Sequence, residues 1–153
     1  QFFSPLINKR TDAYNGYTLE GRTRIHMELI KGIRQVIGDK SLFALRLGGC
    51  DYTVGGTTIE DADWACRRFE EGGVDLLDIS GGTCCYARKG HNYPGYFGDI
   101  SEAVKKEVHI PVLLTGGVRT VQDAEMLLKE EKADMIGVGR IITAKPDWGM
   151  ELI

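Results

Sequence analysis

The chain contains the stretch Gly72-Gly73-Val74-Asp75-Leu76-Leu77-Asp78-Ile79-Ser80-Gly81-Gly82, in which an apolar run of strand length lies between two glycine pairs. Three further apolar runs end on glycine, within residues 42–49, 112–117 and 135–139. The segments between the runs have helical periodicity, so strands and helices alternate along the sequence. This alternation predicts an α/β fold built on a parallel sheet. Ligands of such sheets bind at the carboxyl ends of the strands, so the terminal glycines indicate where a site lies.

The composition is that of one globular domain. The 153 residues are 42% hydrophobic, which is sufficient for a core, and the formal net charge is −3. Acidic and basic residues are interspersed, so neither a nucleic-acid partner nor a membrane surface is indicated, and no apolar run is long enough to cross a bilayer. The four cysteines show no CxxC spacing, and we expect reduced thiols in a cytoplasmic protein.

Start and stop signals predict four helices. The first spans residues 22–37, and the second begins within residues 57–60 and ends at Gly72. A shorter third helix is predicted to begin at Asp99, and a fourth at Thr120. The apolar residues that recur at helical spacing are Leu29, Ile30, Ile33, Val36 and Ile37 in the first helix, Ala62, Ala65, Cys66 and Phe69 in the second, and Val121, Ala124, Leu127 and Leu128 in the fourth.

Two architectures fit this alternation. A parallel sheet with helices on one side usually curls into a barrel, but the (β/α)8 form needs twice the number of strands found here. A small doubly wound sheet also fits, and periodicity does not separate the two. The sequence opens on a loop, and another helix would begin at residues 146–148, close to its end, so we expect an incomplete unit.

Several spaced motifs follow one another along the chain. Residues 4–22 read SPLINKRTDAYNGYTLEGR. Further along lie Arg46 in a predicted strand, Gly55-Gly56, the stretch 72–82, Thr115-Gly116-Gly117-Val118-Arg119-Thr120, Gly137-Val138-Gly139-Arg140 and Pro146-Asp147-Trp148. In this order the motifs resemble the old yellow enzyme family of FMN-dependent NADH:flavin oxidoreductases and ene-reductases, whose signature SPxxNxRxDxYGGSxENR is similar to residues 4–22.

The sequence departs from that signature in one segment. Between Tyr14 and Arg22 it is one residue longer, with Tyr17-Thr18 where a single serine is usual, and Gly21 replaces an asparagine. The geometry of this loop is therefore left open.

The resemblance implies the carboxy-terminal half of a (β/α)8 TIM barrel, because the loop similar to residues 4–16 follows the fourth barrel strand in the family. Residues 1–153 would then be a single partial domain. Most contacts to the flavin ring, the pair of residues that holds the substrate and the tyrosine proton donor would lie upstream, so no catalytic acid or base is expected in this chain. The implied activity uses NAD(P)H to reduce FMN and transfers hydride to an activated alkene or a similar small molecule.

Two glycine-containing loops are candidates for binding the FMN phosphate. Gly116-Gly117 and Gly139-Arg140 would occupy the loops after the last two barrel strands, where barrels commonly build a phosphate site. Backbone N–H groups, the start of a helix near Thr120 and the Arg140 guanidinium would donate hydrogen bonds to the phosphate. Alternatively, the glycines only form tight turns and Arg140 is a solvated surface charge.

Arg46 is a charged residue within an otherwise apolar predicted strand, so its side chain must reach a partner or the mouth of the sheet. By resemblance, Arg46 lies beside the N1/C2-carbonyl edge of the flavin, where a fixed cation stabilises the negative charge that arrives with hydride. The alternative is an interior ion pair, with Asp78 as the candidate partner.

Three further polar residues carry weaker signals. His26 and His109 are expected to be structural or solvated, since neither lies in a motif that points to catalysis. Arg119 is either a second phosphate contact or a surface residue at a helix start.

The segment 82–98 is the longest predicted excursion at the carboxyl side of a strand. It carries His91 and several aromatic residues, and it either lines a substrate pocket or is a plain surface loop. Cys84 and Cys85 lie at the same mouth, but two adjacent thiols do not make a metal site, and no metal is predicted. Near His91 the segment also carries Tyr86, Asn92, Tyr93 and Tyr96, which could contribute to such a pocket.

Two other functions stay open at this stage. The chain could be a catalytically silent fragment or interaction module, or a half-barrel that binds the phosphate of another metabolite. A four-stranded half leaves two sheet edges and part of an apolar inner face uncovered, which predicts a homo-oligomer or association with the missing half of the barrel.

Overall fold

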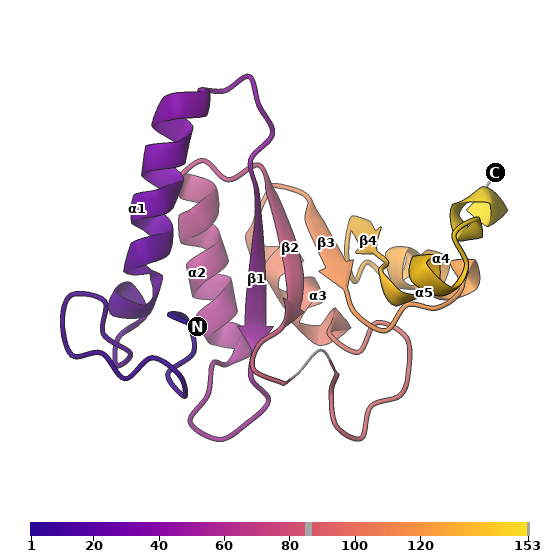
Figure 1. Ribbon diagram of the computed structural model, residues 1–153, viewed down its shortest axis with the longest axis horizontal. Coiled ribbons are helices and arrows are strands. Elements are labelled where there is room, and N and C mark those ends of the chain that lie inside the picture. Colours follow the sequence, from indigo (N-terminus) through magenta and orange to yellow (C-terminus); the bar gives the residue numbers. More distant parts are fainter. Residues whose placement is uncertain (85–86, 153) are drawn as a thin grey trace.

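A single parallel sheet organises the chain. In the computed structural model, which describes residues 1–84 and 87–152, the strands have the sequential order β1-β2-β3-β4 (Figure 1). The register aligns Arg46 with Asp78, Asp78 with Leu113, and Leu113 with Met135. The strands are β1 (Ala44–Cys50), β2 (Leu76–Gly81), β3 (Val112–Thr115) and β4 (Met135–Gly137).

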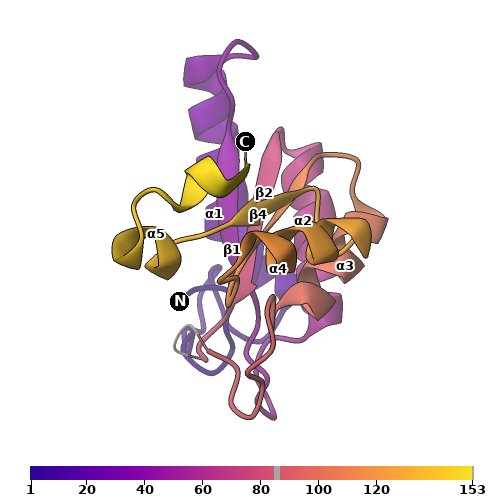
Figure 2. The same ribbon diagram turned by 90° about the vertical axis from the view of Figure 1, so that its right-hand side faces the viewer.

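Helices precede or connect the strands. The four longer ones are α1 (Leu19–Ile37), α2 (Ile59–Glu71), α3 (Gly98–Glu107) and α4 (Val121–Lys129), and the short α5 (Arg140–Ala144) and the 3-10 helix η1 (Trp148–Leu152) follow β4. Figure 2 shows α5 and η1 apart from α2 and α3. No helix among the described residues combines the length and the apolar character that a membrane span requires.

The core lies between one face of the sheet and the helices. Every residue of the predicted α2 face is fully buried, which confirms that part of the sequence analysis. Alternate residues of the strands face these helices, because side chains of a strand alternate between its two faces. The core residues are Leu47, Leu77, Ile79, Val112 and Leu114 from the strands, Ala62, Ala65, Cys66 and Phe69 from α2, Ile100 and Val104 from α3, and Ala124 and Leu127 from α4.

The order of the strands decides between the two architectures. In a doubly wound sheet the strand order reverses and helices cover both faces, whereas here the order is sequential and the core lies on one face. The four strands and their helices therefore have the arrangement of half a (β/α)8 barrel.

The apolar residues of α1 are not the buried face that the sequence predicts. Ile30 is buried, but Leu29, Ile33 and Val36 are exposed to 56%, 39% and 85%. The helix packs on α2, and no other described element covers this flank. Leu128 of α4 is likewise exposed. Periodicity correctly indicates the helices, but the burial of each side chain depends on the neighbouring elements.

The glycine pair of β1 lies inside the strand and does not end it. A Cβ on Gly48 would lie 2.9 Å from the carbonyl oxygen of Gly81, and one on Gly49 would lie 2.5 Å from Cγ2 of Ile100. These glycines are therefore required by the close approach of β2 and α3, which the sequence alone does not reveal.

The departure from the family signature is explained by Asn15. Its side-chain oxygen accepts hydrogen bonds from the N–H groups of Tyr17 and Thr18, both at 3.0 Å, and Thr18 caps α1. A Cβ on Gly21 would lie 2.6 Å from the carbonyl oxygen of Asn15. The longer loop thus starts α1 at Leu19, before the predicted start, and requires glycine at position 21.

Candidate functional site

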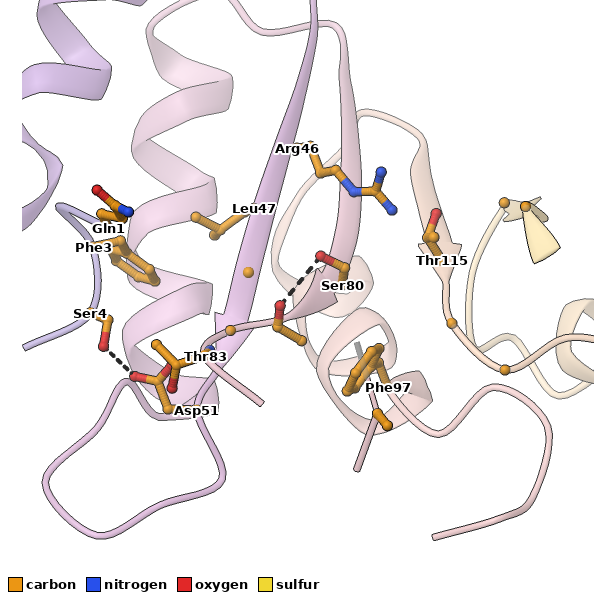
Figure 3. Close-up of a pocket in the computed structure, with 18 of the residues that line it drawn as sticks. Gln1, Phe3, Ser4, Arg46, Leu47, Asp51, Ser80, Thr83, Phe97 and Thr115 are labelled. Atoms are coloured by element: carbon orange, nitrogen blue, oxygen red, sulfur yellow. Dashed lines mark hydrogen bonds between the residues drawn. The ribbon is translucent and has the colours of Figure 1, made fainter. Parts of the chain in front are cut away.

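A cavity of about 1070 Å³ opens at the carboxyl ends of the strands. Its lining comes from the first residues of the chain, from all four strands or the loops that follow them, and from the segment before α3 (Figure 3). The structure brings every predicted site residue to this cavity. These residues are Arg46, Gly116, Gly117, Gly139 and Arg140.

Arg46 extends from β1 across the open face of the sheet toward Thr115 (Figure 3). Its Nε lies 3.4 Å from Oδ2 of Asp78, whose Oδ1 accepts a hydrogen bond of 2.8 Å from the Thr115 hydroxyl. The ion pair with Asp78 therefore exists, but it is not interior, because 57% of the Arg46 side chain is exposed. An exposed pair of this kind contributes little to stability, so the Arg46 cation remains available to a ligand in the cavity.

Asp51 is a cavity residue that the sequence analysis missed. It follows β1 directly, and only 2% of it is exposed. The Ser4 hydroxyl donates a hydrogen bond of 2.7 Å to its carboxylate, and the N–H groups of Thr57 and Thr83 donate bonds of 2.8 and 2.7 Å. These donors come from three separate segments, so the only signal in the sequence is an acidic residue directly after a strand.

The charge of Asp51 depends on those donors. Burial alone would raise the pKa of the carboxyl group, but the hydrogen bonds from Ser4, Thr57 and Thr83 outweigh that effect and hold the pKa below its ordinary value. Asp51 is thus an ionised anchor that fixes the amino-terminal segment and the start of the 82–98 segment against β1.

The loop after β3 needs glycine because aromatic rings pack behind it. Gly117 has a φ of 75°, and a Cβ there would lie 2.3 Å from Cε1 of Tyr96. A Cβ on Gly116 would lie 2.6 Å from Cδ2 of Phe97. By contrast, a Cβ on Gly139 would have no heavy atom within 4 Å, so the loop after β4 borders open space.

Arg140 reaches the cavity from the start of α5. Its Nη2 donates a hydrogen bond of 2.8 Å to the hydroxyl of Tyr96, and the residue is exposed. The arginine therefore links the loop after β4 to the aromatic residues that support the loop after β3.

The start of α4 is occupied by the chain's own acid. Oδ2 of Asp123 accepts hydrogen bonds of 3.0 and 3.3 Å from the N–H groups of Thr120 and Arg119. Because this carboxylate already places negative charge at the helix start, the expected phosphate contact near Thr120 is disfavoured. Arg119 itself is exposed and does not line the cavity.

The three histidines lie in different surroundings, and only His26 lines the cavity. His26 borders the cavity and packs against Phe69 with ring centres 5.5 Å apart, and burial lowers the pKa of His26. His109 is almost fully exposed. His91 pairs with the Tyr93 hydroxyl at 2.8 Å and does not line the cavity.

The 82–98 segment lines the cavity only in part. Its described lining residues are Gly82, Thr83, Ala87 and Phe97, so the predicted aromatic pocket wall is reduced to one ring. Cys85 and Tyr86 lie outside the described residues. Among residues 1–84 and 87–152, no group of histidine, cysteine and acidic side chains is arranged to hold a metal ion.

Comparison with known proteins identifies the family. The sequence pattern of the NADH:flavin oxidoreductase / NADH oxidase family matches residues 1–152. The chain belongs to this family. It is 37% identical over 151 residues to an NADPH dehydrogenase of Halalkalibacterium halodurans, a match that covers 99% of this chain and 44% of the relative. It is 32% identical over 152 residues to an NADH oxidase of Thermoanaerobacter brockii, covering 97% of this chain and 23% of the relative.

Solved structures of oxidoreductases share the fold. A complex of 2-naphthoyl-CoA reductase with 2-naphthoyl-CoA superimposes with a TM-score of 0.86 and 28% identity, covering 99% of this chain and 24% of the other. Morphinone reductase in complex with tetrahydroNAD gives a TM-score of 0.71 at 21% identity, covering 98% of this chain and 38% of the other, and shows likeness of fold alone. The chain thus spans less than half the length of these relatives.

The cavity can be tested against FMN, the cofactor of this flavin oxidoreductase family. It has two cations at different places, Arg46 on the open face of β1 and Arg140 beside the glycine loops. Gly139 has no side chain to cover its backbone on the cavity side. The conformation of the loop at Gly116 and Gly117 is limited by the Phe97 and Tyr96 rings packed behind it. This donor set fits a ligand with a phosphate at one end and an electron-accepting ring at the other.

Proposed function

We propose that this chain supplies the phosphate-binding side and one ring-edge contact of the FMN site in an NAD(P)H-dependent oxidoreductase. The observation that carries the proposal is that Arg46, the two glycine loops and Arg140 all line one cavity at the carboxyl ends of the strands. FMN held there would supply the chemistry of hydride transfer between NAD(P)H and an activated alkene or a similar acceptor.

Arg140 would hold the FMN phosphate together with the backbone of the two glycine loops. A guanidinium donates charge-assisted hydrogen bonds to phosphate oxygens, which are stronger than bonds between neutral groups. The absence of a side chain at Gly139, where a Cβ would enter open space, lets the backbone approach the phosphate closely, whereas Gly116 and Gly117 must be glycine because the Phe97 and Tyr96 rings pack behind their loop. Tight turns and phosphate binding are therefore compatible at these positions.

Arg46 would lie at the ring edge that gains negative charge on reduction. The ion pair with Asp78 holds the guanidinium on the open face, and more than half of the side chain stays exposed to the cavity. The Arg46 cation would stabilise negative charge at that edge of a bound ring, since opposite charges attract more strongly once water is displaced.

The reaction also requires groups that this chain does not provide under the proposal. The residues that bind the substrate and donate the proton would come from a preceding half-barrel that closes the sheet. The complete barrel is this chain joined to that preceding half.

The phosphate end of the proposal is tested by Arg140→Ala in the complete barrel. Loss of a charge-assisted hydrogen bond should weaken FMN binding by about 1.5–3 kcal/mol, roughly a 10- to 150-fold increase in Kd. Riboflavin lacks the phosphate, so its Kd should be almost unchanged. Both constants are measured by quenching of flavin fluorescence.

Arg119→Ala is the matched control, because it removes an exposed cation near the same loop that does not line the cavity. It should leave both constants unchanged. Equal losses of FMN and riboflavin affinity in Arg140→Ala would show that Arg140 acts through folding, and no loss for either ligand would refute the phosphate site.

A further inference from the structure

We propose that Tyr96 is the positioning residue of the phosphate site: its hydroxyl aims the Arg140 guanidinium, and its ring sets the shape of the Gly116-Gly117 loop. The inference rests on the proposed function, because it assigns a role within the same site. Tyr96 does not line the cavity and is 5% exposed, so it acts from behind the residues that would meet the ligand.

The contact with Arg140 joins two distant parts of the chain. Tyr96 lies just before α3, and Arg140 begins α5 after β4. The Tyr96 hydroxyl accepts a hydrogen bond of 2.8 Å from Nη2 of Arg140. A free arginine side chain loses rotamer entropy when a ligand fixes it. A partner that restrains the guanidinium beforehand reduces that cost at the moment of binding.

A hydroxyl suits this purpose better than a carboxylate. It is neutral, so it orients the guanidinium without cancelling the positive charge that attracts a phosphate. A guanidinium has five N–H donors, and one bond to Tyr96 leaves the other donors for a ligand. In the same cavity Arg46 has the contrasting arrangement, because its partner is a charged carboxylate, that of Asp78.

The ring of Tyr96 is held firmly enough to act as a support. It meets the Phe97 ring edge-on, with centres 4.6 Å apart, and Phe97 stacks on Tyr52 at 6.1 Å. The Tyr52 hydroxyl donates a hydrogen bond of 2.7 Å to Asp99, and the Arg88 guanidinium lies 4.0 Å from the centre of the Tyr52 ring. These packed side chains lie behind the loop after β3, where only glycine fits at position 117 against the Tyr96 ring.

The experiment compares Tyr96→Phe with the unchanged complete barrel. Phenylalanine keeps the ring, and with it the support for Gly117, but removes the hydroxyl that contacts Arg140. We expect the Kd of FMN to rise about 3- to 10-fold, as for the loss of one neutral hydrogen-bond acceptor, while the Kd of riboflavin stays constant. Tyr93→Phe is the matched control, because the Tyr93 hydroxyl contacts His91 in the same segment and should affect neither ligand.

A double-mutant cycle with Arg140→Ala separates positioning from a general structural role. If Tyr96 acts through Arg140, Tyr96→Phe should have no further effect on FMN affinity once Arg140 is alanine. The inference is overturned if Tyr96→Phe leaves FMN affinity unchanged, weakens riboflavin equally, or adds its full effect in the double variant. If Arg140→Ala itself leaves FMN affinity unchanged, the proposed phosphate site fails first, and this inference fails with it.

Discussion

Arg46 and Asp51 lie at the same edge of the sheet but are held in different ways. Arg46 has one partner at 3.4 Å and a largely exposed side chain, whereas Asp51 is buried and accepts hydrogen bonds from three segments. The sequence predicts Arg46 because a charge inside an apolar strand is conspicuous. It does not predict Asp51, because the groups that surround this carboxylate are brought together only by the fold.

The Asp51 network predicts a pH-dependent loss of stability. Asp51→Asn replaces a carboxylate that accepts three hydrogen bonds by an amide, and the amide NH2 group, itself a donor, would face one of the present donors. We therefore expect the free energy of unfolding to fall by about 2–4 kcal/mol at neutral pH. The pKa of Asp51 is lower in the folded chain than its ordinary value of 3.8, so its stabilisation is fully present above that value and is lost as pH falls through the folded pKa.

Urea unfolding of both proteins from neutral pH down to about pH 2 measures this effect. The difference in the free energy of unfolding between the unchanged chain and Asp51→Asn should become smaller at pH values below the ordinary pKa of an aspartate. Asp39→Asn, at an exposed position, should leave the free energy of unfolding unchanged. A difference for Asp51→Asn that stays constant down to acid pH would contradict an ionised anchor.

At the scale of elements, local signals predict helices better than strands. Thr58 and Thr120 cap α2 and α4 in full capping boxes with acidic residues three positions later, and such signals need no tertiary information. The glycines of β1 are different, because their reason is the approach of Gly81 and Ile100 from other elements. The exposure of the α1 flank has the same origin, since it depends on which elements lie beside it.

The two glycine loops should respond differently to added side chains. Gly117→Ala places a Cβ at a φ of 75° and against the Tyr96 ring, so it should lower the free energy of unfolding by at least about 1–2 kcal/mol from the backbone alone. Gly139→Ala is the matched control, because its φ is −135° and its Cβ would enter open space. Thermal or urea unfolding without flavin measures both, and equal effects would contradict the structural difference between the loops.

At the scale of the molecule, the repeated strand–glycine–helix pattern predicts a parallel α/β sheet but does not distinguish a doubly wound sheet from half a barrel. The sheet order and the single covered face agree with half a barrel, as the family resemblance implies. The uncovered face is only partly apolar: Leu47 and Leu77 face the helices, whereas Leu76 and Leu113 lie on the open face, the latter in register with Asp78. Arg46, Ser80 and Thr115 line the cavity on the open side, although Met135 is also 45% exposed there.

The open sheet also predicts self-association of the chain. β1 and β4 are edge strands of the described sheet, and edges with unpaired N–H and C=O groups favour pairing with another chain. We expect dimers or larger species whose proportion rises with concentration in sedimentation velocity. A monomer at high concentration with a cooperative thermal transition would show that the sheet is self-sufficient.

The flavin content of the purified chain tests the central claim most directly. If the chain holds only the phosphate side and one ring edge of the FMN site, most of the apolar burial of the ring is lost without the preceding half-barrel. After addition of FMN and desalting, visible absorbance should show far less than one flavin per chain for the chain alone, and one flavin per complete barrel. Stoichiometric flavin on the chain alone, or none on the complete barrel, would contradict the account.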